Sequence, residues 1–283
     1  MSAFDASVIA GPEERITPAP PPPRTPVRSL RGLGAALTVL ALVALFVLSW
    51  EKTDFSIGAL IDGWHGMVSF LGDAIPPDLN WQEVLHPAID AALVTLYIAF
   101  LGTALSIPFA LLFAILGART TTPNVVVYQA SRSLLSFLRA VPDVVFALIF
   151  VTAVGLGPFP GVLALLFHNV GVMGKLWSES IEEIDLGPVE ALRTTGARGP
   201  QVVANAVVPA VTPQFIGLLL YRFDVNVRAS LVLGLVGAGG IGFLINESIK
   251  LFRFDQMLTY ILVVLVLVVA VDNLSAWVRR RIA

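Results

Sequence analysis

Residues 178–209 read SESIEEIDLGPVEALRTTGARGPQVVANAVVP, a polar stretch between two strongly apolar ones. Asp185 or Gly187 can cap a helix that has Pro188 at its first position, where the missing N–H of proline costs nothing. Glu190 then lies in the first turn, where a carboxylate is favoured by the positive end of the helix dipole. The first part of this stretch is therefore predicted to be a short helix.

The second part predicts a turn followed by another helix. Gly196 can take the left-handed conformation that ends a helix. Pro200 is placed to begin a second short helix, which runs into an apolar stretch at Pro209. Helix, sharp turn and helix make a rigid projection that can fit a groove on another protein.

The composition places the chain in a membrane. Of 283 residues, 56% are hydrophobic and only 13% are charged, whereas soluble domains carry about 25% charge. The chain has no cysteine, which excludes disulfides, thiolate zinc sites and thiol nucleophiles. The net charge of -2 gives no indication of nucleic acid, and the three histidines, His65, His86 and His168, form no ligand pair at helical spacing.

Apolar runs of sufficient length predict an all-α integral membrane protein with about six transmembrane helices. The predicted spans are 32–50, 88–116, 141–155, 160–177, 209–233 and 257–278. Residues 124–140 are expected to form a helix that starts at the cytoplasmic surface and feeds the third span. Proline and glycine inside spans are tolerated because neighbouring helices satisfy the freed backbone groups.

The remaining segments complete the domain organisation. Residues 1–31 are rich in proline and are predicted to be a disordered cytoplasmic tail. Residues 51–86 are too polar to span and are predicted to be an amphipathic, extracytoplasmic interfacial segment. Residues 87–280 form the predicted core, and 178–206 is a loop within it.

The distribution of Lys and Arg predicts the orientation. In the six-span arrangement most of them fall on one side, and only Lys52, Lys250 and Arg253 fall on the other. Both termini and the 178–206 loop are therefore predicted to be cytoplasmic. The tryptophans at span ends are expected either at the membrane interface or in ordinary packing; they are Trp50, Trp177 and Trp277.

The 178–209 stretch resembles the EAA loop of ABC importer permeases, whose pattern is E-A-A, three residues, G, nine residues, I, one residue, L-P. Glu190, Ala191, Gly196 and Pro209 match in place. Three positions depart from the pattern: Leu192 replaces the second alanine, Ala206 the isoleucine and Val208 the leucine. The resemblance implies a type I ABC importer (MetI-like) permease core. In it Glu190, Ala191, Gly196, Ala197 and Pro209 would couple to the ATPase subunit.

The same resemblance implies partners and a location. These are two cytoplasmic ATPase subunits, which use ATP and magnesium, an extracytoplasmic substrate-binding protein, a second permease copy in a homodimer, and membrane lipid. The chain lacks the P-loop pattern, so it is predicted to bind no cofactor, to hold no metal and not to be an enzyme. The expected place is the bacterial inner membrane, with no nucleic-acid partner.

Residues 219–242 resemble the phosphonate importer permeases, which carry a Tyr-Arg-Phe-acidic-x-Asn-x-Arg-Ala-Ser run before Gly-Ala-Gly-Gly-Ile-Gly. The matching positions are Tyr221, Arg222, Phe223, Asp224, Asn226, Arg228, Ala229 and Ser230. The resemblance implies that the cargo is a phosphonate or a related small phosphorus oxyanion such as phosphite or phosphate. Methionine- or glycine-betaine-type cargo is the alternative.

The charges of this run also have a physical meaning of their own. A charged group within a span costs several kcal/mol unless it is paired or hydrated, roughly 3 or more. Asp224 and Arg228 are four apart on one helix face and can pair, while Arg222 and Asn226 share a neighbouring face. Two interpretations stay open: a structural ion pair, or an arginine that faces the passage and attracts an oxyanion.

The glycines Gly237, Gly239, Gly240 and Gly242 follow this run. Their spacing satisfies GxGxxG, but a dinucleotide site is rejected because a membrane helix rather than a strand precedes them. They are instead predicted to form a tight re-entrant turn on the outer side. The resemblance implies that this turn lies near the outer mouth of the pathway. In the fourth predicted span, His168 and Asn169 are expected to make interhelical hydrogen bonds or to line the pathway.

Two further function classes are weighed. An ion-coupled secondary transporter needs a carboxylate within the spans, for which Asp224 is the candidate, although its pairing with Arg228 argues against a free carrier. An integral-membrane enzyme is disfavoured because the spans contain no cysteine, clustered histidines or paired carboxylates.

Overall fold

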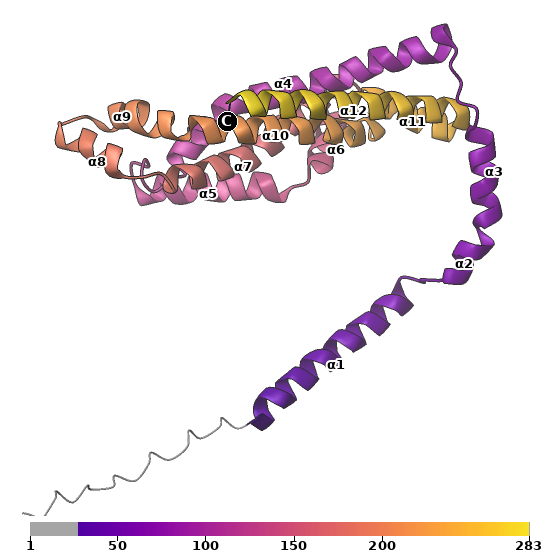
Figure 1. The fold of residues 1–283 in the computed structure, drawn as a ribbon, viewed down its shortest axis with the longest axis horizontal. Coiled ribbons are helices and arrows are strands. Elements are labelled where there is room, and N and C mark those ends of the chain that lie inside the picture. Colours follow the sequence, from indigo (N-terminus) through magenta and orange to yellow (C-terminus); the bar gives the residue numbers. More distant parts are fainter. Residues whose placement is uncertain (1–27, 283) are drawn as a thin grey trace, which may run out of the picture. The chain divides into compact units, whose positions relative to one another are not determined.

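The computed structural model describes residues 28–282, and within them all regular structure is helical. The chain divides into two units, residues 1–64 and 65–283, and each is described by itself. The first unit contains α1 (Arg28–Lys52) and α2 (Ile57–Asp62) (Figure 1). All side chains from residue 34 to residue 62 are exposed within the chain. At 1.5 Å per residue, α1 is about 37 Å long, enough to cross a bilayer core of about 30 Å.

The first predicted span, 32–50, is thus confirmed by α1. The predicted tail, 1–31, lies largely outside the described residues. Its last part, 28–31, belongs to α1.

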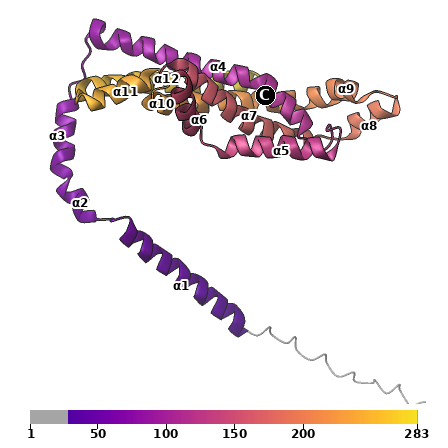
Figure 2. The ribbon, with the colours of Figure 1, turned by 180° about the vertical axis from the view of Figure 1, so that it is seen from behind.

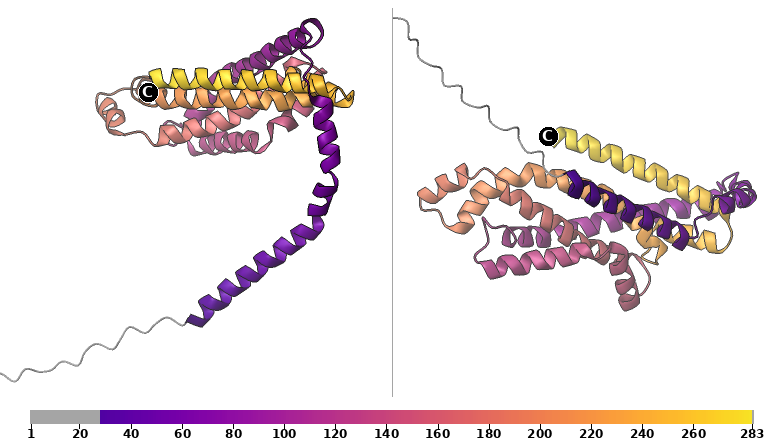
Figure 3. Two further views of the ribbon diagram at one scale, coloured as in Figure 1. Left: turned by 45° about the vertical axis from the view of Figure 1, so that its right-hand side comes forward. Right: turned by 90° about the horizontal axis from the view of Figure 1, so that it is seen from below.

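The second unit is a helical bundle (Figures 1 and 2). Its elements are α3 (Trp64–Ala74), the π-helical turn η1 (Trp81–Leu85), α4 (His86–Leu116), α5 (Val125–Ala140), α6 (Asp143–Val154), α7 (Pro158–Glu182), α8 (Gly187–Thr194), α9 (Gly199–Val202), the π-helical turn η2 (Val203–Val207), α10 (Val208–Leu235), α11 (Ile241–Lys250) and α12 (Phe254–Ile282). The helices α8 and α9 lie at one end of the bundle and α11 at the other. Figure 3 shows α10 and α12 running alongside each other.

Small residues let the central helices approach closely. A Cβ atom on Gly102 of α4 would lie 2.6 Å from Cβ of Leu165 on α7. A Cβ atom on Gly171 of α7 would lie 2.7 Å from the carbonyl carbon of Leu138 on α5. Packing of this kind is typical of helices in lipid, where apolar burial alone does not drive association. The helix α7 is therefore the centre of the bundle, with α4 and α5 on either side.

An apolar cluster, called here the second cluster to distinguish it from the packing around Gly102 and Gly171, lies at the α8–α9 end of the bundle. It surrounds Met173, Trp177 and Ile181 of α7. Trp177 is only 3% exposed, and its ring stacks on Phe215 with 4.5 Å between centroids. Trp177 therefore packs in the core, the second of the two expected roles, and α7 continues past it to Glu182.

The described residues contain five helical stretches long and apolar enough to cross a membrane, or six if the bent pair α5 and α6 counts as one. This confirms an all-α membrane fold with about six spans. The predictions for 88–116, 160–177, 209–233 and 257–278 are confirmed by α4, α7, α10 and α12. The predicted interfacial segment 51–86 contains α2, α3 and η1.

The prediction that residues 141–155 form one membrane-spanning helix is wrong. The helix α6 has 12 residues, about 18 Å at 1.5 Å per residue, too short to cross alone. It meets α5 at an angle of 85°. Val141 is extended and Pro142 follows it; proline cannot donate to a continuing helix and disfavours a helical residue before it.

Candidate functional site

The helix α8 forms where the sequence predicted it. It begins at Gly187 with Pro188 in its first turn, and Leu186 is its N-cap residue. Asp185 contributes a turn rather than the cap: its Oδ1 accepts the N–H of Gly187 at 3.0 Å. Glu190 lies in the first turn, as expected from the helix dipole.

The turn after α8 depends on one glycine. Gly196 has φ +84°, in the left-handed region that glycine adopts without a Cβ penalty. The N–H of Ala197 donates to the carbonyl of Leu192 at 3.2 Å and closes the turn. Next, the N–H of Arg198 donates to the side chain of Gln201 at 2.8 Å, and α9 begins. The predicted helix, turn and helix are confirmed, with α9 continuing through η2 into α10.

The α8–α9 projection has a buried side and an exposed side. Val189 is 4% exposed and packs with Val202, Val207 and the α7 residues of the second cluster. Glu190, Ala191 and Gly196 are exposed, Ala197 is half-buried, and Pro209 is exposed at the start of α10. The predicted coupling residues therefore share one protruding structure that is anchored from within.

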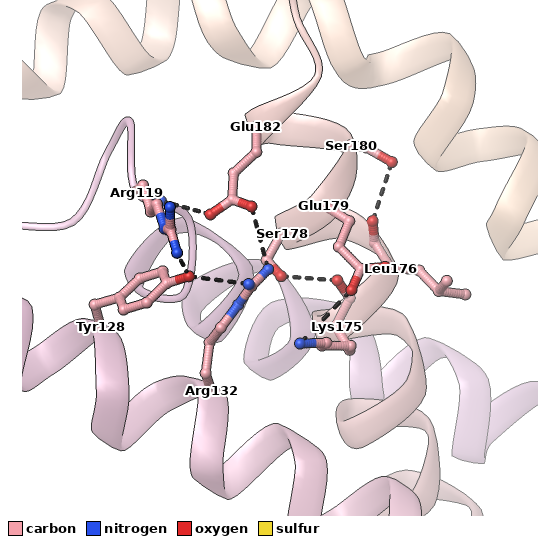
Figure 4. A network of polar contacts seen from close by, with 9 residues as sticks. All are labelled: Arg119, Tyr128, Arg132, Lys175, Leu176, Ser178, Glu179, Ser180 and Glu182. Carbon is pink, nitrogen blue, oxygen red and sulfur yellow. Dashed lines mark hydrogen bonds and ion pairs between the residues drawn. The ribbon is translucent and has the colours of Figure 1, made fainter. Parts of the chain in front are cut away.

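A polar network fixes the base of this projection (Figure 4). Glu182, the last residue of α7, accepts the backbone N–H of Arg119 at 2.9 Å and pairs with the Arg132 guanidinium at 3.3 Å. The hydroxyl of Tyr128 accepts from both arginines, at 3.1 and 2.9 Å. The hydrogen bond to Tyr128 raises the pKa of Arg119 above its ordinary value, so this guanidinium stays charged. We call Arg119, Tyr128, Arg132 and Glu182 the root network.

The root network ties the end of α7 to α5 and to the α4–α5 connection. A second link joins α8 to the same connection, where the guanidinium of Arg193 donates to the carbonyl of Thr120 at 3.5 Å. Between these segments lies a cavity of about 660 Å³, with Thr121 and Pro123 on one side and Val189 and Pro200 on the other. The projection is thus held at its base, with open space beside it.

A different polar group lies on α10, within a span. Asp224 accepts from the guanidinium of Arg228, which confirms the predicted pair at i and i+4. Arg228 also pairs with Asp272 of α12 at 3.3 Å. Helical spacing does not predict this second pairing, because Asp272 lies 44 residues further along the chain.

Arg222 belongs to a separate group. Its Nη2 donates to Oδ1 of Asn169 on α7 at 2.9 Å and to Oδ1 of Asn226 at 3.5 Å. Asn226 in turn donates to the hydroxyl of Thr103 on α4 at 2.7 Å. The expected interhelical role of Asn169 is confirmed, and His168 likewise contacts the carbonyl of Val141 at 3.2 Å. We call Arg222, Asn169, Asn226 and Thr103 the Arg222 network.

The glycine turn joins α10 to α11. Gly237, Gly239 and Gly240 all have positive φ, and the N–H of Ile241 donates to the hydroxyl of Thr95 on α4 at 2.9 Å. A Cβ on Gly242 would collide with the backbone of Leu231 on α10. The predicted tight turn is confirmed as a geometry, and no strand precedes it among the described residues.

A comparison of the sequence with models of protein families identifies the family. Residues 106–283 match the family model described as "Binding-protein-dependent transport system inner membrane component". The chain belongs to this family. The matched region contains the α8–α9 projection, the charged part of α10 and the glycine turn. As a member, the chain is an integral membrane permease of the ABC importer type.

Curated relatives of this permease cover most of it. The phosphite transport system permease protein PtxC of Stutzerimonas stutzeri is 40% identical over 251 residues, 88% of this chain and 89% of the relative. The phosphate-import permease protein PhnE of Mycolicibacterium smegmatis is 41% identical over 237 residues, 84% of this chain but 44% of the relative's length.

A solved structure supports the permease fold. The permease shares a TM-score of 0.60 and 19% identity with a chain of the MetNI methionine ABC transporter in an inward-facing conformation, over 73% of this chain and 99% of that one. The expected MetI-like fold is confirmed.

Proposed function

We propose that this permease forms the translocation pathway of an ABC importer for phosphite, phosphonate, phosphate or a related small phosphorus oxyanion. Two ATPase subunits on the cytoplasmic side would supply the energy by hydrolysing ATP. An extracytoplasmic binding protein would deliver the cargo. The observation that carries the proposal is the exposed α8–α9 projection, anchored by Val189 and fixed at its base by the root network.

The projection suits a force-bearing contact. Its exposed residues, Glu190, Ala191 and Gly196, are free to meet another protein, whereas its base cannot shift without breaking charge-assisted hydrogen bonds, which are about twice as strong as neutral ones. A partner that grips α8 would therefore move α7 and α5 together. Ala197 and Pro209 would hold the turn and the entry into α10 in register.

A second permease copy would complete the pathway, either identical to this chain or a paralogue. The pathway candidates on α10 are Arg222, Asp224, Asn226 and Arg228. Arg228 and Asp272 have 46% exposed side chains on a spanning surface, where contact with lipid is costly. Cover by a second copy or by water in a passage would remove that cost. The glycine turn would lie at the outer mouth.

The cargo assignment is supported by relatives named for phosphite and phosphate at about two-fifths identity. Guanidinium groups bind such oxyanions through two parallel N–H donors. The location follows in the same way: the inner membrane, with both termini and the projection cytoplasmic, as the Lys and Arg distribution favours. Methionine- or betaine-type cargo and an ion-coupled carrier based on Asp224 remain the alternatives for the test.

The experiment is transport by the whole complex in liposomes, with the ATPase and binding protein co-expressed from the same system. Uptake of labelled phosphite, methylphosphonate and phosphate is measured together with ATP hydrolysis. Uptake that needs ATP and the binding protein supports the proposal. Uptake driven by an ion gradient without ATP, or uptake of methionine or betaine instead, would contradict it.

Two substitutions test the projection itself. Gly196→Val should uncouple hydrolysis from uptake, because a β-branched residue is an outlier at positive φ, while no atom lies within 4 Å of the added Cβ. Gly196→Asn is the matched control, since asparagine tolerates this conformation. Glu190→Ala should weaken ATPase binding. Its control is Glu183→Ala, which makes the same change of charge. Glu183 is exposed and lies between α7 and α8. Equal behaviour of each variant and its control would remove the coupling role.

A further inference from the structure

Two arginines on α10, six positions apart, are satisfied in different ways. Arg228 has two carboxylate partners, Asp224 and Asp272. Arg222 is only 8% exposed, and within residues 28–282 no carboxylate lies within 4.0 Å of it. Asp143 acts on Arg222 electrostatically from beyond that distance. The direct hydrogen-bond partners of Arg222 among the described residues are therefore the amide oxygens of Asn169 and Asn226.

The groups around Arg222 that lack a hydrogen-bond partner are N–H donors. Its Nη1 makes no hydrogen bond with any described residue, since the bonds of the guanidinium use Nε and Nη2. Asn169 is fully buried, and its Nδ2 has no partner among the described groups. The amide oxygens of Asn169 and Asn226 already accept from Arg222, and Nδ2 of Asn226 is used by Thr103.

Nδ2 of Asn169 is fully buried without a partner, and such a group destabilises a fold unless a ligand or water satisfies it. A site with one full positive charge and open N–H groups is complementary to an anion, because an anion supplies acceptors and no donors. A neutral or cationic solute would leave the charge uncompensated. Nη1 of Arg222 is not among the fully buried atoms that lack a partner, so this group keeps some exposure.

We propose that Arg222 and Asn169 form an oxyanion-binding site between α7 and α10, and that Arg228 is the structural member of the run. The ligand is a small tetrahedral oxyanion, held by the Nη1 group of Arg222 and the Nδ2 group of Asn169. Identification of this ligand with the cargo rests on the proposed function. Under this proposal Arg222 meets the anion, and Arg228 joins α10 to α12.

The first test measures anion binding without transport. The permease–ATPase complex in nanodiscs is heated with phosphite, phosphate, methylphosphonate or chloride, at matched ionic strength. A phosphorus oxyanion should raise Tm and chloride should not. Stabilisation by chloride alone would overturn the assignment to oxyanions, and absence of any anion effect on the unaltered complex would overturn the site.

Asn169→Asp is the decisive variant because it keeps the shape of the side chain. The new carboxylate can pair with Arg222, so the complex should fold, while the site loses a donor and its net charge. Oxyanion affinity should fall about tenfold or more, since each 1.4 kcal/mol is a factor of ten and a charge-assisted bond is worth about 1.5–3 kcal/mol. Arg222→Gln should give the same loss if it folds.

The matched control is Asn273→Asp, the same chemical change on the exposed side of α12, where the amide contacts only the carbonyl of Val269. It should leave anion stabilisation unchanged. Equal stabilisation by phosphite in Asn169→Asp and in the unaltered complex would overturn the proposal. Binding that is present and sensitive to Asn169, in a complex that transports no phosphorus oxyanion, would keep the site and remove the cargo assignment.

Discussion

The root network and the Arg222 network use the same cation in two ways. At the base of the projection, Arg132 pairs with Glu182 and both retain access to water, with 20% and 24% of their side chains exposed. Inside the bundle, the hydrogen-bond partners of Arg222 within residues 28–282 are amide oxygens, and the residue is nine-tenths buried. A guanidinium paired with a carboxylate makes a fixed link between helices. One that has only neutral partners keeps its charge available to a ligand.

Among the variants that test the two networks, Glu182→Lys is expected to have the largest effect on uptake. The variant removes the acceptor of two hydrogen bonds and places a third positive charge beside Arg119 and Arg132. Loss of charge-assisted bonds with the partner left behind should cost about 3 kcal/mol or more. Uptake should fall much more than ATP hydrolysis, because the projection no longer moves with α5. Unchanged uptake per ATP hydrolysed would mean that the root network has no role in coupling.

A smaller effect is expected at Arg228, and it should depend on which carboxylate is removed. Asp224→Asn should lower the Tm of the complex more than Asp272→Asn, because the side chain of Asp224 is 12% exposed and that of Asp272 is 46% exposed. Less exposed partners are screened less by water. Neither variant should alter stabilisation by phosphite. A loss of anion stabilisation in both would return Arg228 to the oxyanion site.

The smallest effect is expected from Glu179→Gln. Glu179 lies one turn before Glu182 on α7 and pairs with Lys175 at 3.6 Å, with 43% of its side chain exposed. Exposed pairs at i and i+4 contribute about 0.3–0.5 kcal/mol. Uptake and Tm should therefore stay close to those of the unaltered complex. A large loss would mean that charge near the end of α7, rather than the specific bonds of Glu182, governs coupling.

Local patterns made part of this molecule predictable. Pro188 and Gly196 act on their own backbone, so α8 and its turn could be predicted from spacing. Asp224 and Arg228 lie one turn apart on a helix, so their pairing followed from periodicity. These features depend on residues close in sequence.

Contacts distant in sequence were not predictable in this way. Glu182 and Arg132 are 50 residues apart, and Arg222 and Asn169 are 53 apart. Periodicity identifies the face of a helix and not the neighbour that the face meets. Pro142 predicts a break between α5 and α6, and α6 begins at Asp143. The 85° angle depends on the packing of α6 against α7 and α10, which periodicity does not predict.

In α8, the residue that fixes the helix and the residues that another molecule can contact are different: Val189 is buried, whereas its neighbours are exposed. Val189 and the turn at Gly196 fix the backbone, while Glu190 and Ala191 point away from the bundle. The outward residues can be exchanged without repacking the interior. If the proposed function holds, exchanging a few surface positions of α8 would fit the permease to a different ATPase subunit without changing its interior.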